Sequence, residues 1–165
     1  MSRGFGIFCI ILSLIVPTIW VVQGITFNKN CGGYIKQAAD ANTVELAIER
    51  LDKAIAYAEA ENLTDGYTSV FYKTEDDNIG FWYQNLLACR SELASCTNSS
   101  QLEKTNVLLK VRESLTDNGE HGTVITKPDG ISRYPNNALM GIFMWVSIAL
   151  FCFGLWLVTE GYYIL

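Results

Sequence analysis

Two long stretches of the chain carry no charged side chain. Residues 4–28 contain no Asp, Glu, Lys or Arg, and neither do residues 134–159. Within them, the apolar runs 5–25 and 138–158 are each long enough, at about 1.5 Å per residue, to cross a hydrocarbon core of about 30 Å. The sequence therefore predicts two transmembrane helices, at residues 1–25 and 138–158, with short ends outside them. Aromatic residues lie at or near the ends of the runs, where rings favour the lipid–water interface: Trp20, Trp145, Trp156, Tyr162 and Tyr163.

The first run has an alternative interpretation as a cleaved signal sequence. Arg3 supplies a minimal charged start, and Val22-Gln23-Gly24 offers a cleavage site of small or medium residues. Against cleavage, the run is longer than a usual signal core, and Val22 and Gln23 fit the cleavage pattern poorly. An uncleaved helix is the favoured prediction, and removal of residues 1–24 stays open as the alternative.

The two runs separate a polar middle, for which we expect a helical domain at 26–117 and a polar linker at 118–137. Arg3 and Glu160 cancel, so the middle carries the net charge of −5 of the whole chain. That charge argues against a nucleic-acid surface, which needs clustered basic residues. We expect this domain on the extracytoplasmic side of an integral membrane protein, because Arg3 adjoins the first run and long acidic loops cross membranes largely regardless of charge. Lys29, Lys36, Lys127 and Arg133 near the runs favour the opposite orientation.

The middle shows the signals of several amphipathic helices. Asn42 followed by Glu45, Thr74 followed by Asp77, and Ser100 followed by Glu103 each resemble the start of a helix. Apolar residues then recur every three or four positions, as on one buried face: Val44, Ile48, Leu51, Ile55 and Ala58 in the first helix; Ile79, Trp82, Leu86, Cys89, Leu93 and Cys96 in the second; Leu108, Val111 and Leu115 in the third. A shorter helix is expected at 34–41. The predicted fold class is therefore all-α, a small antiparallel bundle of three to four helices between two transmembrane helices.

Two segments between the helices are less regular. The stretch GYTSVFYKT at 66–74 is rich in β-branched and aromatic residues, and we expect an ordered loop whose rings cover the helix ends. Glycines, prolines and amides after Leu115 indicate a linker, with a short strand at 123–126 as an alternative inside it. The single histidine, His121, lies in this linker and is expected to be an ordinary exposed imidazole.

The cysteines offer one candidate covalent link. Cys9 and Cys152 lie inside the apolar runs, where they are expected to pack as small apolar residues. Cys89 and Cys96 are seven residues apart on one helix, about 10.5 Å, which is too far for a mutual disulfide. A possible disulfide joins Cys31 to Cys89 or Cys96; the alternative is buried, reduced thiols. No metal site, cofactor-binding site or catalytic residue is predicted.

Aromatic side chains are unusually dense between residues 67 and 83. A domain this small cannot obviously bury all of them, so some are expected at a partner surface or on the bilayer. The candidate interaction surface comprises Tyr67, Phe71, Tyr72, Phe81 and Tyr83.

These features predict a membrane-anchored, non-enzymatic structural or accessory protein, a scaffold, adaptor or small subunit that contacts the bilayer and other membrane protein subunits. The alternative is a ligand-sensing extracytoplasmic domain, because a helical bundle between two spans looks like the sensory half of a bacterial transmembrane receptor. That resemblance is one of architecture only. The ends at 1–4 and 159–165 are too short for an output domain, so such a sensor would need a separate signalling partner.

Overall fold

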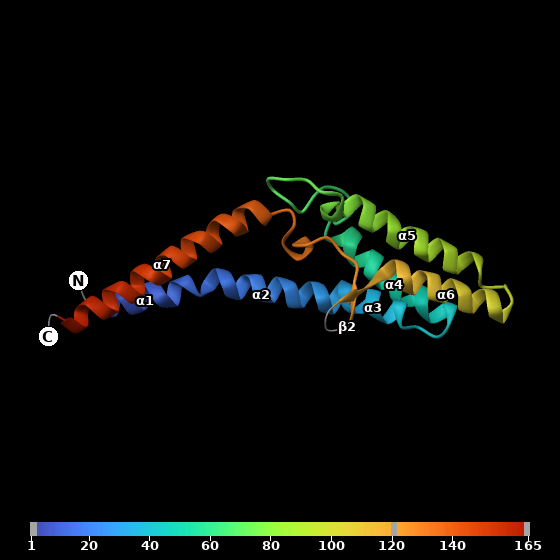
Figure 1. Cartoon of the computed structure of the whole chain (residues 1–165), viewed down its shortest axis with the longest axis horizontal. Helices are drawn as coiled ribbons and strands as arrows, with labels where there is room; N and C mark the ends of the chain where they lie inside the picture. The colour runs from blue at the N-terminus through green and yellow to red at the C-terminus, as the bar shows by residue number, and fades with distance from the viewer. Residues whose placement is uncertain (1–2, 120–121, 164–165) are drawn as a thin grey trace. The chain divides into compact units, whose positions relative to one another are not determined.

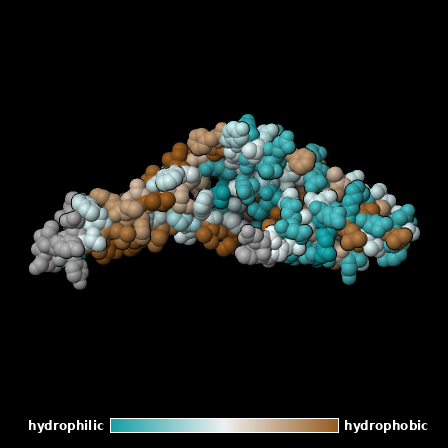
Figure 2. Space-filling view, in the orientation of Figure 1, coloured by the Kyte–Doolittle hydropathy of each residue, from teal (hydrophilic) through white to brown (hydrophobic). Residues whose placement is uncertain are grey.

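A computed structural model of the protein describes residues 3–119 and 122–163, with side chains described as far as Thr159. The chain is mostly helical and contains two helical stretches that are long and apolar enough to cross a membrane, Arg3–Ala39 and Asn137–Thr159. It divides into two compact units (Figure 1): Met1–Gly24 with Pro135–Leu165, and Ile25–Tyr134. In Figure 2, hydrophobic residues gather over the apolar helices and hydrophilic residues over the second unit.

The first unit consists of α1 (Arg3–Ser13), most of α2 (Ile15–Phe27) and α7 (Asn137–Tyr163). The break between α1 and α2 at Leu14 follows from Pro17, because a proline lacks the N–H that would bond to the carbonyl of Ser13 and its ring crowds that carbonyl. Just before the break, the hydroxyl of Ser13 donates to the carbonyl oxygen of Ile10 at 2.7 Å.

Helices α1 and α7 pack together through two glycines. A Cβ added at Gly6 would lie 2.9 Å from the carbonyl oxygen of Gly154, and one added at Gly154 would lie 2.8 Å from that of Gly6. Gly6 also neighbours Leu157, whereas Gly154 neighbours Cys9 and Ile10, so the two helices run antiparallel. The backbones approach this closely because neither residue carries a side chain, as is common where apolar helices meet in membranes.

The second unit contains the remaining elements. They are η1, a π-helical turn at Asn28–Gly32; α3 (Gly33–Ala39); α4 (Val44–Ala60); η2, a 3-10 turn at Glu75–Asp77; α5 (Ile79–Ser95); α6 (Gln101–Leu115); β1 (Thr116–Gly119); β2 (Gly122–Ile125); and η3, a 3-10 turn at Ile131–Arg133. Helix α4 packs against α3 and α5, and α6 packs against α3 and α5. Strands β1 and β2 pair antiparallel, from Thr116 opposite Ile125 to Gly119 opposite Gly122.

One continuous core lies between these helices. The faces predicted from the three-and-four spacing point into it: Val44, Leu51, Ile55 and Ala58 of α4, Ile79, Trp82, Leu86, Cys89 and Leu93 of α5, and Val111 and Leu115 of α6 are buried. Ile48, Cys96 and Leu108 are half-buried at its margin. Polar contacts join the helices at the surface. Arg112 of α6 donates to Asp40 at the end of α3 at 2.8 Å, a bond that lowers the pKa of the Asp40 carboxyl. Arg90 of α5 donates to Asp52 of α4 at 2.9 Å.

Two of the three predicted helix starts were placed wrongly. Helix α4 is capped by Thr43 and not by Asn42, because the extended backbone of Thr43 lets its hydroxyl accept the N–H of Leu46. Helix α5 is capped by Asn78 and not by Thr74, since the carbonyl of the Asn78 side chain accepts the N–H of Phe81 at 3.0 Å. The Ser100 start of α6 is confirmed.

At the start of α6, Ser100 and Glu103 form a reciprocal capping box. Thr74 has a different function from the one predicted: its hydroxyl donates to the carboxylate of Asp77 at 2.6 Å within the preceding turn.

Both of the less regular segments differ from their predictions. The chain after α6 forms the β1–β2 hairpin, so the strand at 123–126 is present as β2, ending at Ile125, and the second unit is not purely helical. The loop at 66–74 does not cover the helix ends with all its rings. Phe71 and Tyr72 point to solvent, because the backbone of Thr68 bonds to Asp77 and that of Ile79 to Gly66, which closes the base of the loop and turns its tip outward.

The packing of α1 on α7 predicts that a side chain at Gly154 separates the two helices. A Cβ there would lie 2.8 Å from the carbonyl oxygen of Gly6, a backbone atom that cannot move aside without its helix. We expect Gly154→Leu to weaken the contact, so that after proteolysis within the second unit the two apolar peptides no longer copurify in mild detergent.

The matched control is Gly141→Leu on the same helix, because no atom lies within 4 Å of a Cβ at Gly141 and its two peptides should stay together. Equal separation of the peptides in both variants, or in neither, would contradict the packing.

Candidate functional site

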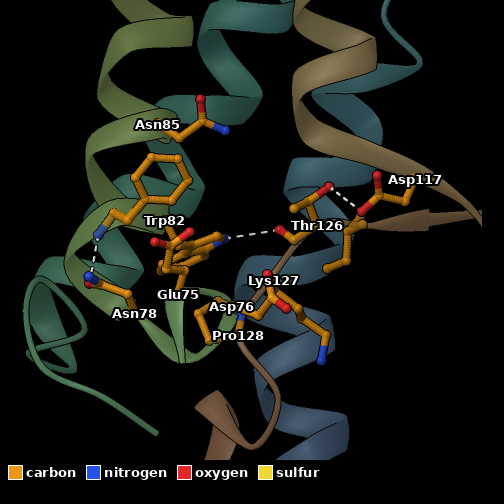
Figure 3. A pocket seen from close by; sticks show the side chains of 11 residues that line it. Glu75, Asp76, Asn78, Trp82, Asn85, Asp117, Thr126, Lys127 and Pro128 are labelled. Carbon is orange, nitrogen blue, oxygen red and sulfur yellow. Dashed lines mark hydrogen bonds between the residues drawn. The ribbon is translucent and has the colours of Figure 1, made fainter. Parts of the chain in front are cut away.

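An open cleft of about 780 Å³ lies at the N-terminal end of α5 in the second unit (Figure 3). One side is formed by the turn before α5 and its first two turns: Glu75, Asp76, Asn78, Phe81, Trp82 and Asn85. The other side is formed by the hairpin and the chain that follows it: Asp117, Ile125, Thr126, Lys127 and Pro128. A volume of 300–1,000 Å³ is typical of ligand-binding clefts, so the space suffices for a small molecule or for part of a partner chain.

A hydrogen bond between the two sides holds the cleft together. The indole N–H of Trp82 donates to the carbonyl oxygen of Thr126 at 3.1 Å, and the hydroxyl of Thr126 donates to Asp117 at 3.0 Å (Figure 3). The ring of Trp82 is buried against Phe27, with ring centroids 6.4 Å apart. About one turn further along α5, the side-chain amide of Asn85 donates to the carbonyl oxygen of Ser114 at 3.2 Å.

The charge of the cleft is predominantly negative. Glu75, Asp76 and Asp117 contribute three carboxylates, against the one ammonium group of Lys127. That ammonium group lies 5.7 Å from the ring centroid of Phe27, within the range of a cation–π contact. Phe81 is 71% exposed, so one of the rings that line the cleft is open to a ligand. A cleft lined by carboxylates and an exposed ring favours a cationic group.

The five aromatic residues of the predicted interaction surface lie in different places in the structure. Phe81 lines the cleft, and Tyr67 lies beside it, where its hydroxyl accepts from the Asn78 amide at 3.5 Å. Phe71 and Tyr72 form the exposed tip of the neighbouring loop. Tyr83 lies elsewhere: its hydroxyl donates to Glu59 of α4 at 2.7 Å, and this bond raises the pKa of Tyr83. Tyr83 therefore joins α5 to α4 and does not share a surface with the other four.

The second side of the cleft was not predicted, because residues 118–137 were expected to be a linker. The β-branched run at 123–126 was the available signal, since it indicated a strand that would hold this segment in place. The bond between Trp82 and Thr126 spans 44 positions and leaves no local pattern in the sequence.

The three cysteines of the second unit are free thiols in the structure. Cys31 is fully buried, and its sulfur lies 3.7 Å from the carbonyl oxygen of Ala54 in α4. Cys89 is buried on the inner face of α5, where desolvation raises the pKa of its thiol and Glu92 adds to the effect. Neither pairing of Cys31, with Cys89 or with Cys96, is formed. His121 lies outside the described residues. Among the residues that the structure describes, no three His, Cys, Asp or Glu side chains are grouped as metal ligands.

Neither the known protein-family models, nor the curated proteins, nor the solved structures contain a match to this chain.

Burial predicts the reactivity of the thiols. Alkylation requires an accessible thiolate, so Cys31 and Cys89 should resist a maleimide in the folded full chain and react once it is unfolded, with Cys96 reacting faster in the folded state. Peptide mass spectrometry after labelling with and without denaturant measures this. If Cys31 reacts in denaturant only after a reductant is added, it is bridged, and the free-thiol arrangement is contradicted.

Proposed function

We propose that the chain is a membrane-anchored, non-enzymatic accessory protein that holds a small helical domain at the membrane surface. In this proposal both apolar stretches cross the bilayer, the first without being cleaved, and helices α3 to α6 act as one antiparallel bundle. The close contact of Gly6 with Gly154 supports a retained first helix, since α7 would otherwise lose the residues that bury its glycine.

The cleft is the observation that carries the proposed activity, which is to bind a segment of another subunit. An open site suits a chain that enters and leaves it. The three carboxylates and the exposed ring of Phe81 that line it suit a lysine or arginine of that chain. The carboxylate of Asp117 is held by Thr126, so part of the site is positioned before any partner binds. Such preorganisation lowers the entropic cost of association.

Copurification with a cleft variant tests the proposal. The full chain is extracted in mild detergent from cells that express it at native level, separated by size, and its co-eluting proteins are identified by mass spectrometry. We expect a fixed set of partners with the unmodified chain, and at least a tenfold loss of one partner in Glu75→Gln/Asp76→Asn, because about 1.4 kcal/mol of lost interaction corresponds to a factor of ten.

The matched control is Glu61→Gln/Glu113→Gln, which also removes two negative charges, but from exposed positions outside the cleft. Equal loss in both variants would assign the effect to net charge and not to the cleft. A chain that elutes alone, near its own mass with detergent, would contradict the accessory function altogether.

The same cleft also supports the second candidate, a ligand-sensing domain that acts with a separate signalling partner. Its volume accommodates a small organic cation as well as a side chain. The two functions differ in a measurable way: a sensor shows a rise in melting temperature of the full chain with a small ammonium or guanidinium compound, and this rise is lost in Glu75→Gln/Asp76→Asn.

The helical domain is proposed to lie on the extracytoplasmic side. Arg3 beside the first apolar stretch and the net negative charge of the domain support this orientation. Protease treatment of sealed, right-side-out vesicles should therefore cut within residues 26–137 and leave two protected apolar fragments. Protection of this segment until the vesicles are opened would place the domain in the cytoplasm.

A further inference from the structure

The loop between α4 and α5 ends in an exposed apolar tip, formed by Val70, Phe71 and Tyr72. Phe71 is 100% exposed and Tyr72 is 78% exposed, the two most exposed rings for which the structure gives side chains. Exposing a whole phenylalanine ring to water is unfavourable, and a soluble surface seldom gathers such residues without a partner.

Backbone hydrogen bonds close the base of the loop below this tip. The backbone N–H of Thr68 donates to the carbonyl oxygen of Asp77 at 3.0 Å, and that of Ile79 donates to Gly66 at 3.0 Å. Within the loop, the Ser69 hydroxyl accepts the N–H of Tyr72 at 3.4 Å. The first two bonds pair the arms of the loop and close its base, and the third orders the turn at the tip.

Both ends of the second unit lie close to the base of this loop. Gly66 packs directly on the ring of Tyr134, so that a Cβ at Gly66 would overlap the phenol, and Tyr134 is the last residue of the unit. At the other end, Phe27 lies two residues after the start of the unit and contacts Trp82 in the first turn of α5. Both chain connections of the second unit therefore begin near the base of this loop.

We propose that the tip, Val70, Phe71 and Tyr72, inserts into the lipid–water interface of the bilayer that the apolar helices cross. This inference rests on the proposed membrane anchorage. Phenylalanine and tyrosine are favoured at that depth, because the rings contact acyl chains while the tyrosine hydroxyl stays hydrated. The tip fixes the end of the domain against the membrane at a third point, beside the two chain connections.

The charges around the tip specify the lipid surface. Between residues 66 and 74 only Lys73 is charged, and its ammonium group lies 4.8 Å from the ring centroid of Tyr67. Glu75, Asp76 and Asp77 follow immediately and would be repelled by an anionic surface. A zwitterionic surface, such as phosphatidylcholine, is therefore the expected contact.

Quenching by brominated lipids tests the insertion. The full-length variants Phe71→Trp and Tyr72→Trp are each reconstituted into phosphatidylcholine nanodiscs with plain or brominated acyl chains, and the fluorescence added over the unmodified chain is measured. We expect the added tryptophan to emit at shorter wavelength than in water and to lose about half of its intensity in brominated lipid, as for a ring at the acyl-chain boundary.

Leu102→Trp is the matched control. Leu102 is 72% exposed and lies in the first turn of α6, which follows the opposite end of α5, about 25 Å along that helix from the loop. Its added tryptophan should show no quenching. Quenching of Leu102→Trp equal to that of Phe71→Trp would mean that the domain lies on its side, which overturns the proposal.

The native tryptophans separate this inference from the anchorage on which it rests. Trp20, Trp145 and Trp156 lie in the apolar helices, so the unmodified chain should itself be quenched by brominated lipid. Quenching of the native residues without quenching at Phe71→Trp and Tyr72→Trp overturns the insertion of the tip and leaves the anchorage intact. No quenching of the unmodified chain overturns both.

Discussion

The second unit depends on one buried junction, in which the indole of Trp82 contacts Phe27 and donates its N–H to Thr126. Three parts of the chain that are far apart in sequence meet there: the end of α2, the first turn of α5 and the segment after the β1–β2 hairpin. A tryptophan suits such a position because it contributes a large apolar area and one donor that must be satisfied when buried. The junction thus closes the core and fixes an otherwise irregular segment.

The proposed functions of this unit follow from that closure. Because Thr126 is held by Trp82, the chain from Ile125 to Pro128 stands opposite the first turns of α5 and leaves the acidic cleft between them. The same end of the unit carries both connections to the apolar helices and the base of the exposed loop. Binding of a partner and seating on a membrane would therefore use neighbouring surfaces of one end of the domain, with Phe81 in the cleft and Phe71 at the tip.

Several structural features could be predicted because they depend on local chemistry. The apolar stretches are recognisable from the absence of charge alone, and the buried faces of α4, α5 and α6 from the three-and-four spacing of their apolar residues. The start of α6 was predictable because Ser100 and Glu103 satisfy each other's backbone groups. The capping residue was harder to predict where two candidates lie within four residues of each other, as Asn42 and Thr43 do, and Thr74 and Asn78. The backbone conformation of each segment then decides which side chain caps the helix.

By itself, the sequence determined that two apolar helices flank a polar, acidic and mainly helical segment, because hydrophobicity and its period are properties of neighbouring residues. Only the tertiary structure decided that Tyr83 turns to Glu59 while Phe81 lines a cleft, that Gly6 meets Gly154, and that Phe71 stands in solvent. These outcomes depend on contacts between segments that lie far apart in the chain. The packing of the whole core and the closure of the loops decide which segments meet, and no local pattern of residues encodes that.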